Sequence, residues 1–231
     1  MSDALLYTPP GCVLYLDLRK PVGDKLLDYS GHGNHGTIYG AKLSASEPCE
    51  GLVFDGVDDY VRVPYSDVLY AWEGNSPCTF EVLVKPVFPI PPGEHKVILQ
   101  YGDDVGIGRT MISVYYDGCW YSYFGAGSLK SSVKAVKDAF TLVHLVYDGS
   151  KLKMYVDGLF DVEDTRSVDE GKVGDLLIAM HKEFTDYWHG SILLVRIYNR
   201  ALSAEEIKRC YEDIQVRILR RIVSVRDVTV R

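Results

Sequence analysis

The stretch that decides the fold lies near the end of the chain, at residues 190–207, and reads GSILLVRIYNRALSAEEI. Its last part predicts the start of a helix, because Ser203 and Glu206 stand at the spacing of a capping box with Ser203 as the N-cap. Leu202 and Ile207 fit the hydrophobic contact that often surrounds such a cap. The sequence therefore predicts one short helix after this apolar run.

The predicted helix has a single apolar stripe. Ile207, Cys210, Tyr211 and Ile214 recur at intervals of three and four residues, so they share one face. A helix with one apolar stripe docks against a larger core, and we expect this one to lie against a β-structure.

Upstream of the helix, alternating hydrophobic residues predict short strands. In residues 79–85, Phe80, Val82 and Val84 would share the buried face of a strand. Further alternating runs at 112–116, 119–124, 142–147 and 151–156 are separated by Asp-Gly and similar turn residues. Many short strands joined by tight turns favour a β-sandwich or barrel.

Composition limits the possible functions. The chain has 231 residues and a formal net charge of -7, so we expect a single domain and no nucleic-acid binding, which needs a basic face. The N-terminus shows no signal peptide and no run could span a membrane. The compartment stays open between a secreted chain, a cytosolic protein and a virion protein, and an extracellular surface or a virion is favoured.

The five cysteines are widely spaced, without a CxxC pair or zinc-finger spacing, so zinc is not expected. Two interpretations stay open: free cysteines packed as small apolar residues, or one or two disulfides. The odd number leaves at least one thiol unpaired in any intramolecular scheme.

Three segments together carry a family resemblance. Residues 28–36 read DYSGHGNHG, residues 52–64 read LVFDGVDDYVRVP, and the third segment is the quoted 190–207. In this order and at these separations they resemble the laminin-G-like family, which has the concanavalin A-like lectin/glucanase fold. The resemblance spans roughly residues 12–213.

This resemblance implies an all-β fold. We expect a two-sheet antiparallel β-sandwich, a concanavalin A-like jelly roll, over residues 1–213, with one short C-terminal helix. A strand-prone extension would follow at 214–231. The family also implies a non-catalytic carbohydrate-binding or adhesion module, lectin-like, whose partner is a glycan or glycoconjugate; fold alone does not settle this.

Members of the family often bind a structural calcium ion, and the resemblance implies that Asp28 and Asn34 would be its ligands in this chain. The family's acidic pair in the last strand is replaced here by Leu193 and Leu194, which removes two possible ligands. The alternative is that Asp28 and Asn34 only form the turn.

Catalysis is not expected. The E-x-D-x-x-E strand motif of glucanase relatives is absent, as are nucleophile-elbow, zinc-protease and P-loop motifs. We therefore predict that the protein is not an enzyme.

Aromatic residues give the candidate sugar-binding site, because sugars stack on aromatic rings and accept directed hydrogen bonds. If Tyr115 and Trp120 face the core, the neighbouring tyrosines face solvent, although a one-residue shift would reverse the set. The predicted carbohydrate-binding residues are Asp103, Asp104, Arg109, Tyr116, Tyr121 and Tyr123.

The C-terminal segment 215–231 supports an alternative function. It contains five arginines and one aspartate, and its valines and isoleucines alternate with polar residues, which predicts strands. Such strands could close the sheet of the same molecule or pair with a neighbour. The alternative is thus a structural protein of a virion or cell surface, bound to copies of itself or to another structural protein, with assembly residues Arg217, Arg220, Arg221 and Arg226.

Overall fold

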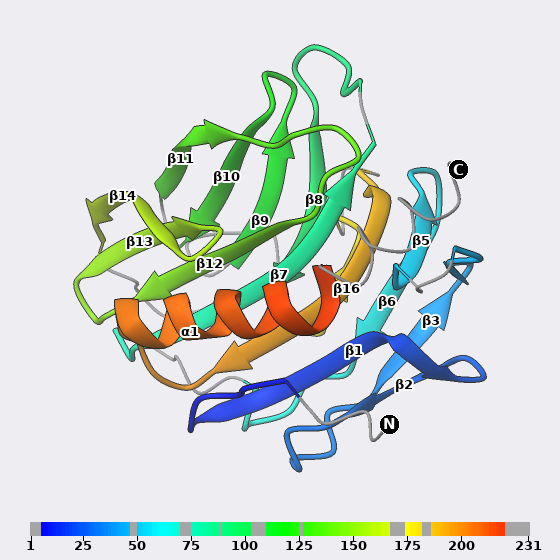
Figure 1. The fold of residues 1–231 in the computed structure, drawn as a ribbon, viewed down its shortest axis with the longest axis horizontal. Helices are drawn as coiled ribbons and strands as arrows, with labels where there is room; N and C mark the ends of the chain where they lie inside the picture. Colours follow the sequence, from blue (N-terminus) through cyan, green and yellow to red (C-terminus); the bar gives the residue numbers. More distant parts are fainter. Residues whose placement is uncertain are drawn as a thin grey trace.

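A computed structural model describes residues 6–46, 50–69, 75–87, 89–102, 110–124, 127–166, 174–181 and 186–219. These residues form an antiparallel β-sandwich with one short C-terminal helix (Figure 1). The predicted fold class is confirmed. The division of the chain at residue 213 stays a prediction.

The two layers differ in what lies on their outer faces. The layer that we call the open layer comprises β3 (Gly36–Tyr39), β6 (Tyr60–Val63), β15 (Leu176–Ile178), β8 (His95–Tyr101), β9 (Thr110–Tyr115), β10 (Cys119–Phe124) and β11 (Gly127–Lys134). The covered layer comprises β1 (Cys12–Val22), β16 (His189–Tyr198), β7 (Cys78–Pro86), β12 (Thr141–Tyr147), β13 (Lys151–Val156) and β14 (Leu159–Thr165).

Three short strands complete the arrangement. β2 (Lys25–Asp28) pairs with both β1 and β3 and so links the layers. β4 (Lys42–Leu43) pairs with β5 (Leu52–Asp55), which in turn pairs with the first half of β16. β16 therefore joins strands from three distant parts of the sequence.

The core lies between the layers and is filled by large apolar side chains. Trp120, Trp188, Phe80 and Phe54 are all inaccessible to solvent. Trp120 faces this core, as predicted, because it alternates with Tyr121 along β10.

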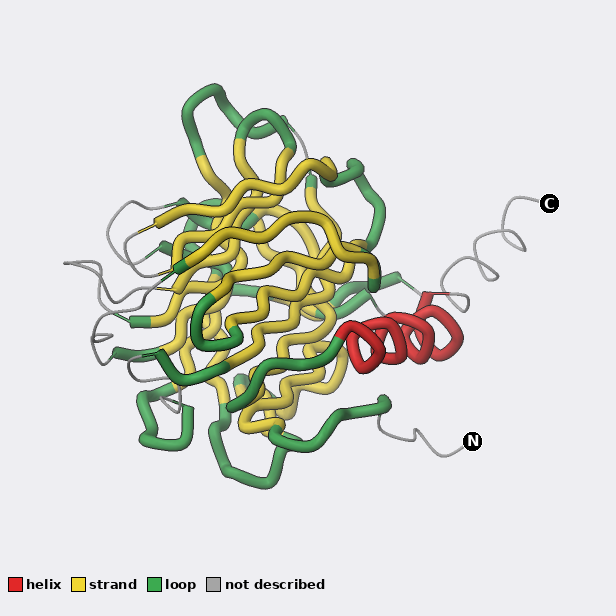
Figure 2. The backbone as a smooth tube through the Cα atoms, turned by 90° about the vertical axis from the view of Figure 1, so that its left-hand side faces the viewer, coloured by secondary structure: helices red, strands yellow, loops and turns green. Residues whose placement is uncertain are grey.

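The helix α1 (Ala204–Ile214) covers the outer face of the covered layer, where it lies across β7, β12 and β16 (Figures 1 and 2). Ile207 and Ile214 pack against residues of these strands, as the apolar stripe predicted. Burial along β7 is consequently nearly continuous: Phe80, Val82 and Val84 face the core, and Glu81 and Leu83 are buried beneath the helix.

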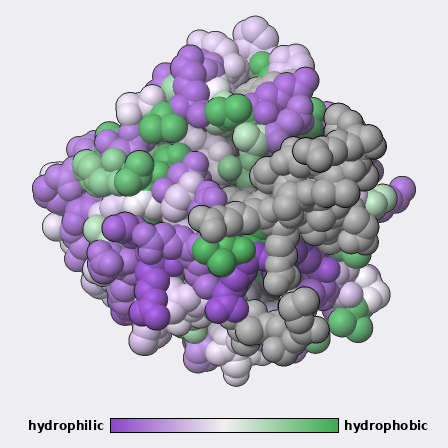
Figure 3. Space-filling model, in the orientation of Figure 1, coloured by the Kyte–Doolittle hydropathy of each residue, from purple (hydrophilic) through white to green (hydrophobic). Residues whose placement is uncertain are grey.

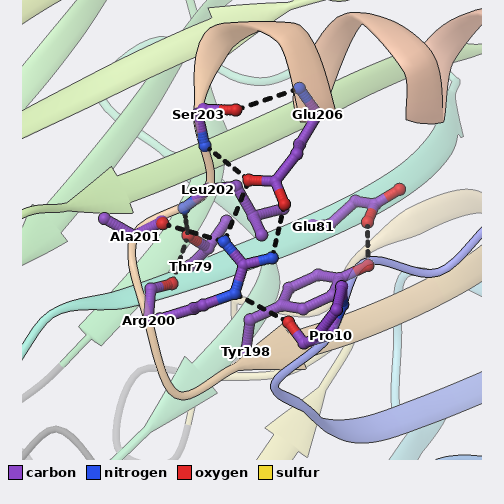
Figure 4. A network of polar contacts seen from close by, with 9 residues as sticks. All are labelled: Pro10, Thr79, Glu81, Tyr198, Arg200, Ala201, Leu202, Ser203 and Glu206. Carbon is purple, nitrogen blue, oxygen red and sulfur yellow. Dashed lines mark hydrogen bonds and ion pairs between the residues drawn. The ribbon is translucent and has the colours of Figure 1, made fainter.

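A polar network fixes the start of α1 (Figure 4). The predicted capping box is present: the Glu206 backbone N–H donates to Ser203 Oγ at 3.2 Å, and the Ser203 N–H donates to Glu206 Oε2 at 2.9 Å. Arg200 donates to both Glu206 oxygens and to the Pro10 carbonyl. Its hydrogen bonds lower the pKa of Glu206 to about 2. The helix start is therefore tied to the N-terminal segment.

The strand predicted from residue 215 onward is wrong for its first part. Gln215–Leu219 continue α1 as a π-helical turn, η1, in which Ile218 is buried against Leu194 and Ile214. Tertiary packing of these apolar side chains overrides the alternating pattern. Arg217 pairs with Asp213 one turn earlier, at 2.5 Å, and Arg220, Arg221 and Arg226 lie outside the described residues.

The four cysteines of the described chain, Cys12, Cys78, Cys119 and Cys210, are free. Cys78, Cys119 and Cys210 are buried, as the apolar-packing interpretation predicts, and Cys12 is partly buried. None of the described helices is long and apolar enough to cross a membrane. The space-filling view shows polar residues over much of the face that carries α1, with small scattered apolar patches (Figure 3).

Candidate functional site

The outer face of the open layer carries aromatic and charged side chains from β6, β9 and β10, whose residues alternate between the core and the outside. In β6, Val61 and Val63 face the core, while Tyr60 and Arg62 face outward. On this face Tyr60, Tyr115, Tyr121 and Tyr123 are partly exposed and Arg62 is exposed, whereas the outward Gln100, Met111 and Ser113 are buried.

A cleft of about 310 Å³ opens on this face. Its residues come from β6, from β15, from the segments at either end of β15 and from the end of β8. The lining consists of Tyr60, Arg62, Gly102, Asp175, Leu177, Met180 and Tyr187. Two tyrosines, an ion pair and two apolar side chains thus share one cavity, the combination of stacking surfaces and directed polar groups that a sugar requires.

Arg62 and Asp175 form the polar part of the cleft. Arg62 Nε donates to Asp175 Oδ2 at 2.5 Å, and the Tyr65 backbone N–H donates to Asp175 Oδ1 at 2.9 Å. The hydrogen bond to Asp175 raises the pKa of Arg62. These contacts hold the carboxylate in place and compensate its charge.

The ring of Tyr60 packs against a second tyrosine on the neighbouring strand. Tyr39 lies directly opposite it on β3, and the two rings stack with centroids 4.5 Å apart and planes 9° from parallel. Stacking of this kind limits the rotation of a half-exposed ring, so Tyr60 is preorganised at the edge of the cleft.

A second aromatic group lies farther along the same face. His95 of β8 contacts Tyr115 of β9 and Tyr121 and Tyr123 of β10, with ring centroids 4.3, 5.3 and 6.0 Å away. We call these four residues the aromatic platform. The Tyr121 hydroxyl donates to Ser128 Oγ at 2.9 Å, which orients that ring.

The predicted sugar-binding residues divide into three sets. Tyr121 and Tyr123 lie on the outer face, within the platform. Tyr116 is exposed in the turn after β9, its ring 4.4 Å from that of Tyr115. Asp103, Asp104 and Arg109 lie outside the described residues.

The expectation that Tyr115 faces the core is wrong. Ile112 and Val114 are the inward residues of β9, which places Tyr115 on the outer face beside His95. The sequence analysis also missed the cleft residues Tyr60 and Arg62. Their alternation with Val61 and Val63 was the signal that could have found them.

The predicted calcium residues form a closed network of hydrogen bonds. Asp28 accepts from the backbone N–H groups of Tyr15, Ser30 and Asn34 and from the Ser30 hydroxyl. The Asn34 amide donates to the Val13 carbonyl and accepts from Ser66. The oxygens that calcium would need are engaged by protein donors, which favours the turn-forming role.

Leu193 and Leu194, which stand in place of the family's acidic pair, are buried in the cluster beneath α1 and η1. Their apolar side chains pack with Ile214 and Ile218. The substitution therefore serves the docking of the helix.

A buried ionic network lies on the opposite side of the molecule, between α1 and the covered layer. Arg196 Nη2 donates to Glu81 Oε1 at 2.5 Å, and the Tyr198 hydroxyl donates to Glu81 Oε2 at 3.1 Å. Burial opposes ionisation of Glu81, but Arg196 and then His144 outweigh it and hold its pKa below the usual value. Burial lowers the pKa of His144 to about 4.

Ligand atoms of Glu81, His144 and Cys210 lie within 4.8 Å of one another, as do those of Asp55, Asp58 and Asp59. In the first group, Arg196 already binds Glu81, and burial raises the pKa of the Cys210 thiol. Both effects oppose a bound cation there.

Comparison with known proteins identifies the family. The profile of the concanavalin A-like lectin/glucanases superfamily, in its Laminin_G_3 form, matches residues 55–208. The chain belongs to this superfamily. The match covers both the cleft strand β6 and the closing strand β16, and it confirms the family resemblance. Among curated proteins, none matches the chain.

Solved structures share the superfamily's fold at low identity. Trypanosoma rangeli sialidase is 18% identical with a TM-score of 0.70; the match covers 90% of this chain and 33% of the sialidase. The binding domain of Paraclostridial Mosquitocidal Protein 1 is 14% identical with a TM-score of 0.70, over 87% of this chain and 52% of that one. The chain thus spans about a third of the sialidase's length.

A third structure has nearly the same extent as this chain. Domain 4 of AbnA, an extracellular arabinanase of Geobacillus stearothermophilus, was solved in complex with arabinotriose. It is 17% identical with a TM-score of 0.66, and the match covers 87% of this chain and 98% of that domain. Because these identities are below 20%, the three solved structures show a shared fold and nothing more.

Proposed function

We propose that this superfamily member is a non-catalytic carbohydrate-binding module whose ligand site is the cleft on the open layer. The observation that carries the proposal is the combination of Tyr60 and Tyr187 with the Arg62–Asp175 pair in one cavity. Tyrosine faces stack on the C–H groups of a sugar ring, and the ion pair offers fixed donors and acceptors to its hydroxyls.

Two further points support a binding role. The AbnA domain, similar in fold and extent, was solved with arabinotriose, so this sandwich can present a sugar site. Glu81 and His144, a buried acid–base pair whose pKa values are both lowered, lie beneath α1 on the other layer and are inaccessible to a substrate. The cleft itself is suited to holding a ligand through ring contacts.

The test is a glycan array followed by calorimetry with the best ligand, for the wild type and three variants. Tyr60→Ala and Arg62→Ala should each weaken binding about tenfold or more, the factor that 1.4 kcal/mol gives. Phe160→Ala is the matched control, because Phe160 is an exposed aromatic residue on β14 of the covered layer. Absence of glycan binding, or equal affinity in all variants, would refute the proposal.

A further inference from the structure

The cleft has a polar end and an apolar end, because β6 and β15 run antiparallel beneath it. Leu177 lies opposite Arg62, so Asp175, two residues earlier, lies toward one end of the cleft, and the residues that follow β15 lie toward the other end, beside Tyr60. Arg62 Nε reaches toward the first end, where it donates to Asp175 at 2.5 Å. The charged groups of the cleft are therefore gathered at one end.

The backbone at the end of β15 brings a methionine into the other end. Ile178 and Ala179 both face the core, which breaks the alternation of the strand. Ala179 has a φ of 71°, in the left-handed region that residues other than glycine rarely adopt. Its N–H donates to the Ile98 carbonyl and its carbonyl accepts from the Trp188 N–H, both at 2.8 Å, so the turn is held from two sides. Met180 consequently lines the cleft instead of the core.

Two tyrosines complete this end of the cleft. Trp188 is inaccessible in the core, and the residue before it, Tyr187, lines the cleft. Tyr60 lines it from β6, with its ring stacked on that of Tyr39. We call Met180, Tyr60 and Tyr187 the apolar end.

The two ends suit different groups of one sugar. A hydroxyl finds donors and acceptors at Arg62 and Asp175, whereas Leu177 on the floor and Met180 offer no strong hydrogen-bonding group. A hydroxyl pressed against these two side chains loses its bonds to water, and a methyl group in the same place gains from the burial of apolar surface. The lining of the cleft thus favours a sugar that carries a methyl group.

The cleft has the size of a site for a single sugar unit. Its volume of about 310 Å³ lies at the low end of the range of roughly 300–1,000 Å³ for small-molecule sites. Arg62 and Tyr60 are two residues apart on β6, which separates them by about 7 Å along the strand. One sugar ring with its substituents can therefore contact both ends.

We infer that the cleft binds a sugar that carries a methyl group, as a 6-deoxyhexose or an N-acetylhexosamine does. Its ring hydroxyls lie at Arg62 and Asp175, and its methyl group lies against Met180 and Leu177. This inference rests on the proposed function and adds the class of sugar.

The test compares sugars that differ only in the substituent that carries the methyl group, titrated into the full chain and followed by NMR. The pairs are L-fucose with L-galactose, L-rhamnose with L-mannose, N-acetylglucosamine with glucose, and N-acetylgalactosamine with galactose. In the pair that fits the cleft, the member with the methyl group should bind at least about fourfold more tightly, the gain that one buried methyl group gives. Saturation transfer from the protein should be strongest at its methyl protons. The pair that responds distinguishes a 6-deoxyhexose from an N-acetylhexosamine.

Three variants and a control locate the preference. Met180→Gln keeps the length of the side chain and adds an amide, so both members of the pair should bind with nearly equal affinity. Met180→Leu stays apolar and should retain the preference. Arg62→Ala should weaken both members by the same factor and leave their ratio unchanged. Val133→Thr, an apolar-to-polar change at an exposed position of β11, should alter neither affinity.

The outcomes separate the two proposals. If the member without the methyl group binds as tightly as its partner in every pair, while Arg62→Ala still weakens binding, the methyl inference is wrong and the cleft remains a sugar site. A preference that persists in Met180→Gln, or saturation that is weakest at the methyl protons, also overturns the inference. Failure of every sugar here and on the glycan array to bind refutes the proposed function itself. Circular dichroism of each variant checks that it folds.

Discussion

The outer face of each layer carries an arginine–carboxylate pair beside a tyrosine, but the pair is buried on one layer and exposed to solvent on the other. On the covered layer, Glu81, Arg196 and Tyr198 are sealed beneath α1 and bond to one another. On the open layer, Arg62, Asp175 and Tyr60 form a similar set in a cleft that solvent reaches. The helix thus decides whether an outward arginine–carboxylate pair contributes to stability or stays available to a ligand.

Breaking the pair on the covered layer should have the largest effect. Arg196→Met leaves the Glu81 charge buried and should lower the free energy of unfolding by about 3–5 kcal/mol. It also removes the donor to the Tyr7 carbonyl, which holds the N-terminal segment. Urea denaturation at neutral pH measures the loss.

Two matched variants complete that comparison. Arg62→Met breaks the exposed pair and should lower the free energy of unfolding far less than Arg196→Met does. The double variant Glu81→Leu with Arg196→Met should recover much of the loss, because no charge remains buried. Equal losses for Arg62→Met and Arg196→Met would remove the distinction between the faces.

The pH dependence of stability should come from the covered layer. His144 has a pKa of about 4 in the folded protein against 6.5 when exposed, so the unfolded chain binds the proton first as pH falls. The free energy of unfolding should therefore drop between pH 6.5 and 4, by on the order of 3 kcal/mol. Glu81 adds to the loss only below its ordinary pKa of 4.5.

His144→Leu should flatten this slope between pH 6.5 and 4, as measured by denaturation at a series of pH values. Glycan binding should not follow the same curve, because His144 lies on the far side of the sandwich from the cleft. An unchanged slope in the variant would show that other groups control the acid response.

The N-terminal cap of α1 should contribute a smaller amount to the free energy of unfolding than the buried ion pair does. Ser203→Ala removes the acceptor for the Glu206 N–H and should lower the free energy of unfolding by about 1 kcal/mol. Ser203→Asp retains a capping oxygen and should remain close to wild type. If both variants lose the same free energy of unfolding, the capping hydrogen bond does not account for the loss.

On the open layer, a variant of Tyr60 should lose glycan affinity and keep nearly all of its stability. Tyr60→Ala removes a ring that stacks on Tyr39, and cross-strand pairs of this kind contribute about 0.2–1 kcal/mol. Thermal unfolding should therefore change little while glycan affinity falls. A large loss of stability would make Tyr60 a structural residue.

Removing calcium should have the smallest effect. Because Asp28 accepts four hydrogen bonds from the protein, a chelator should leave the melting temperature and the glycan affinity unchanged. A clear drop in melting temperature on adding the chelator, reversed by calcium, would restore the metal-binding role of Asp28 and Asn34.

The sequence predicted the fold well because its signals are local. The capping box at Ser203, the alternation around Phe80 and the inward Trp120 all depend on period and spacing, which a short window contains. The prediction for residues 215–219 was wrong because Ile218 is buried in a cluster that includes Leu83 and Leu142, which come from strands far away in the chain.

The candidate site was predicted only in part for the same reason. Tyr121 and Tyr123 were identified because the aromatic residues of β10 cluster in the sequence. The cleft combines Tyr60 and Arg62 with Asp175 and Tyr187, which lie more than 100 positions later, so only the pairing of β15 with β6 brings them together. Strand register across such distances has no local sequence signal.

The position of β16 has a consequence for how the protein is made. This strand, which ends at Tyr198, pairs with β1, β5 and β7, all of which leave the ribosome long before it. Until β16 emerges, the edges of β1 and β7 have no partner and can pair with those of other nascent chains. Chaperone protection until β16 has emerged should therefore raise the yield of folded protein.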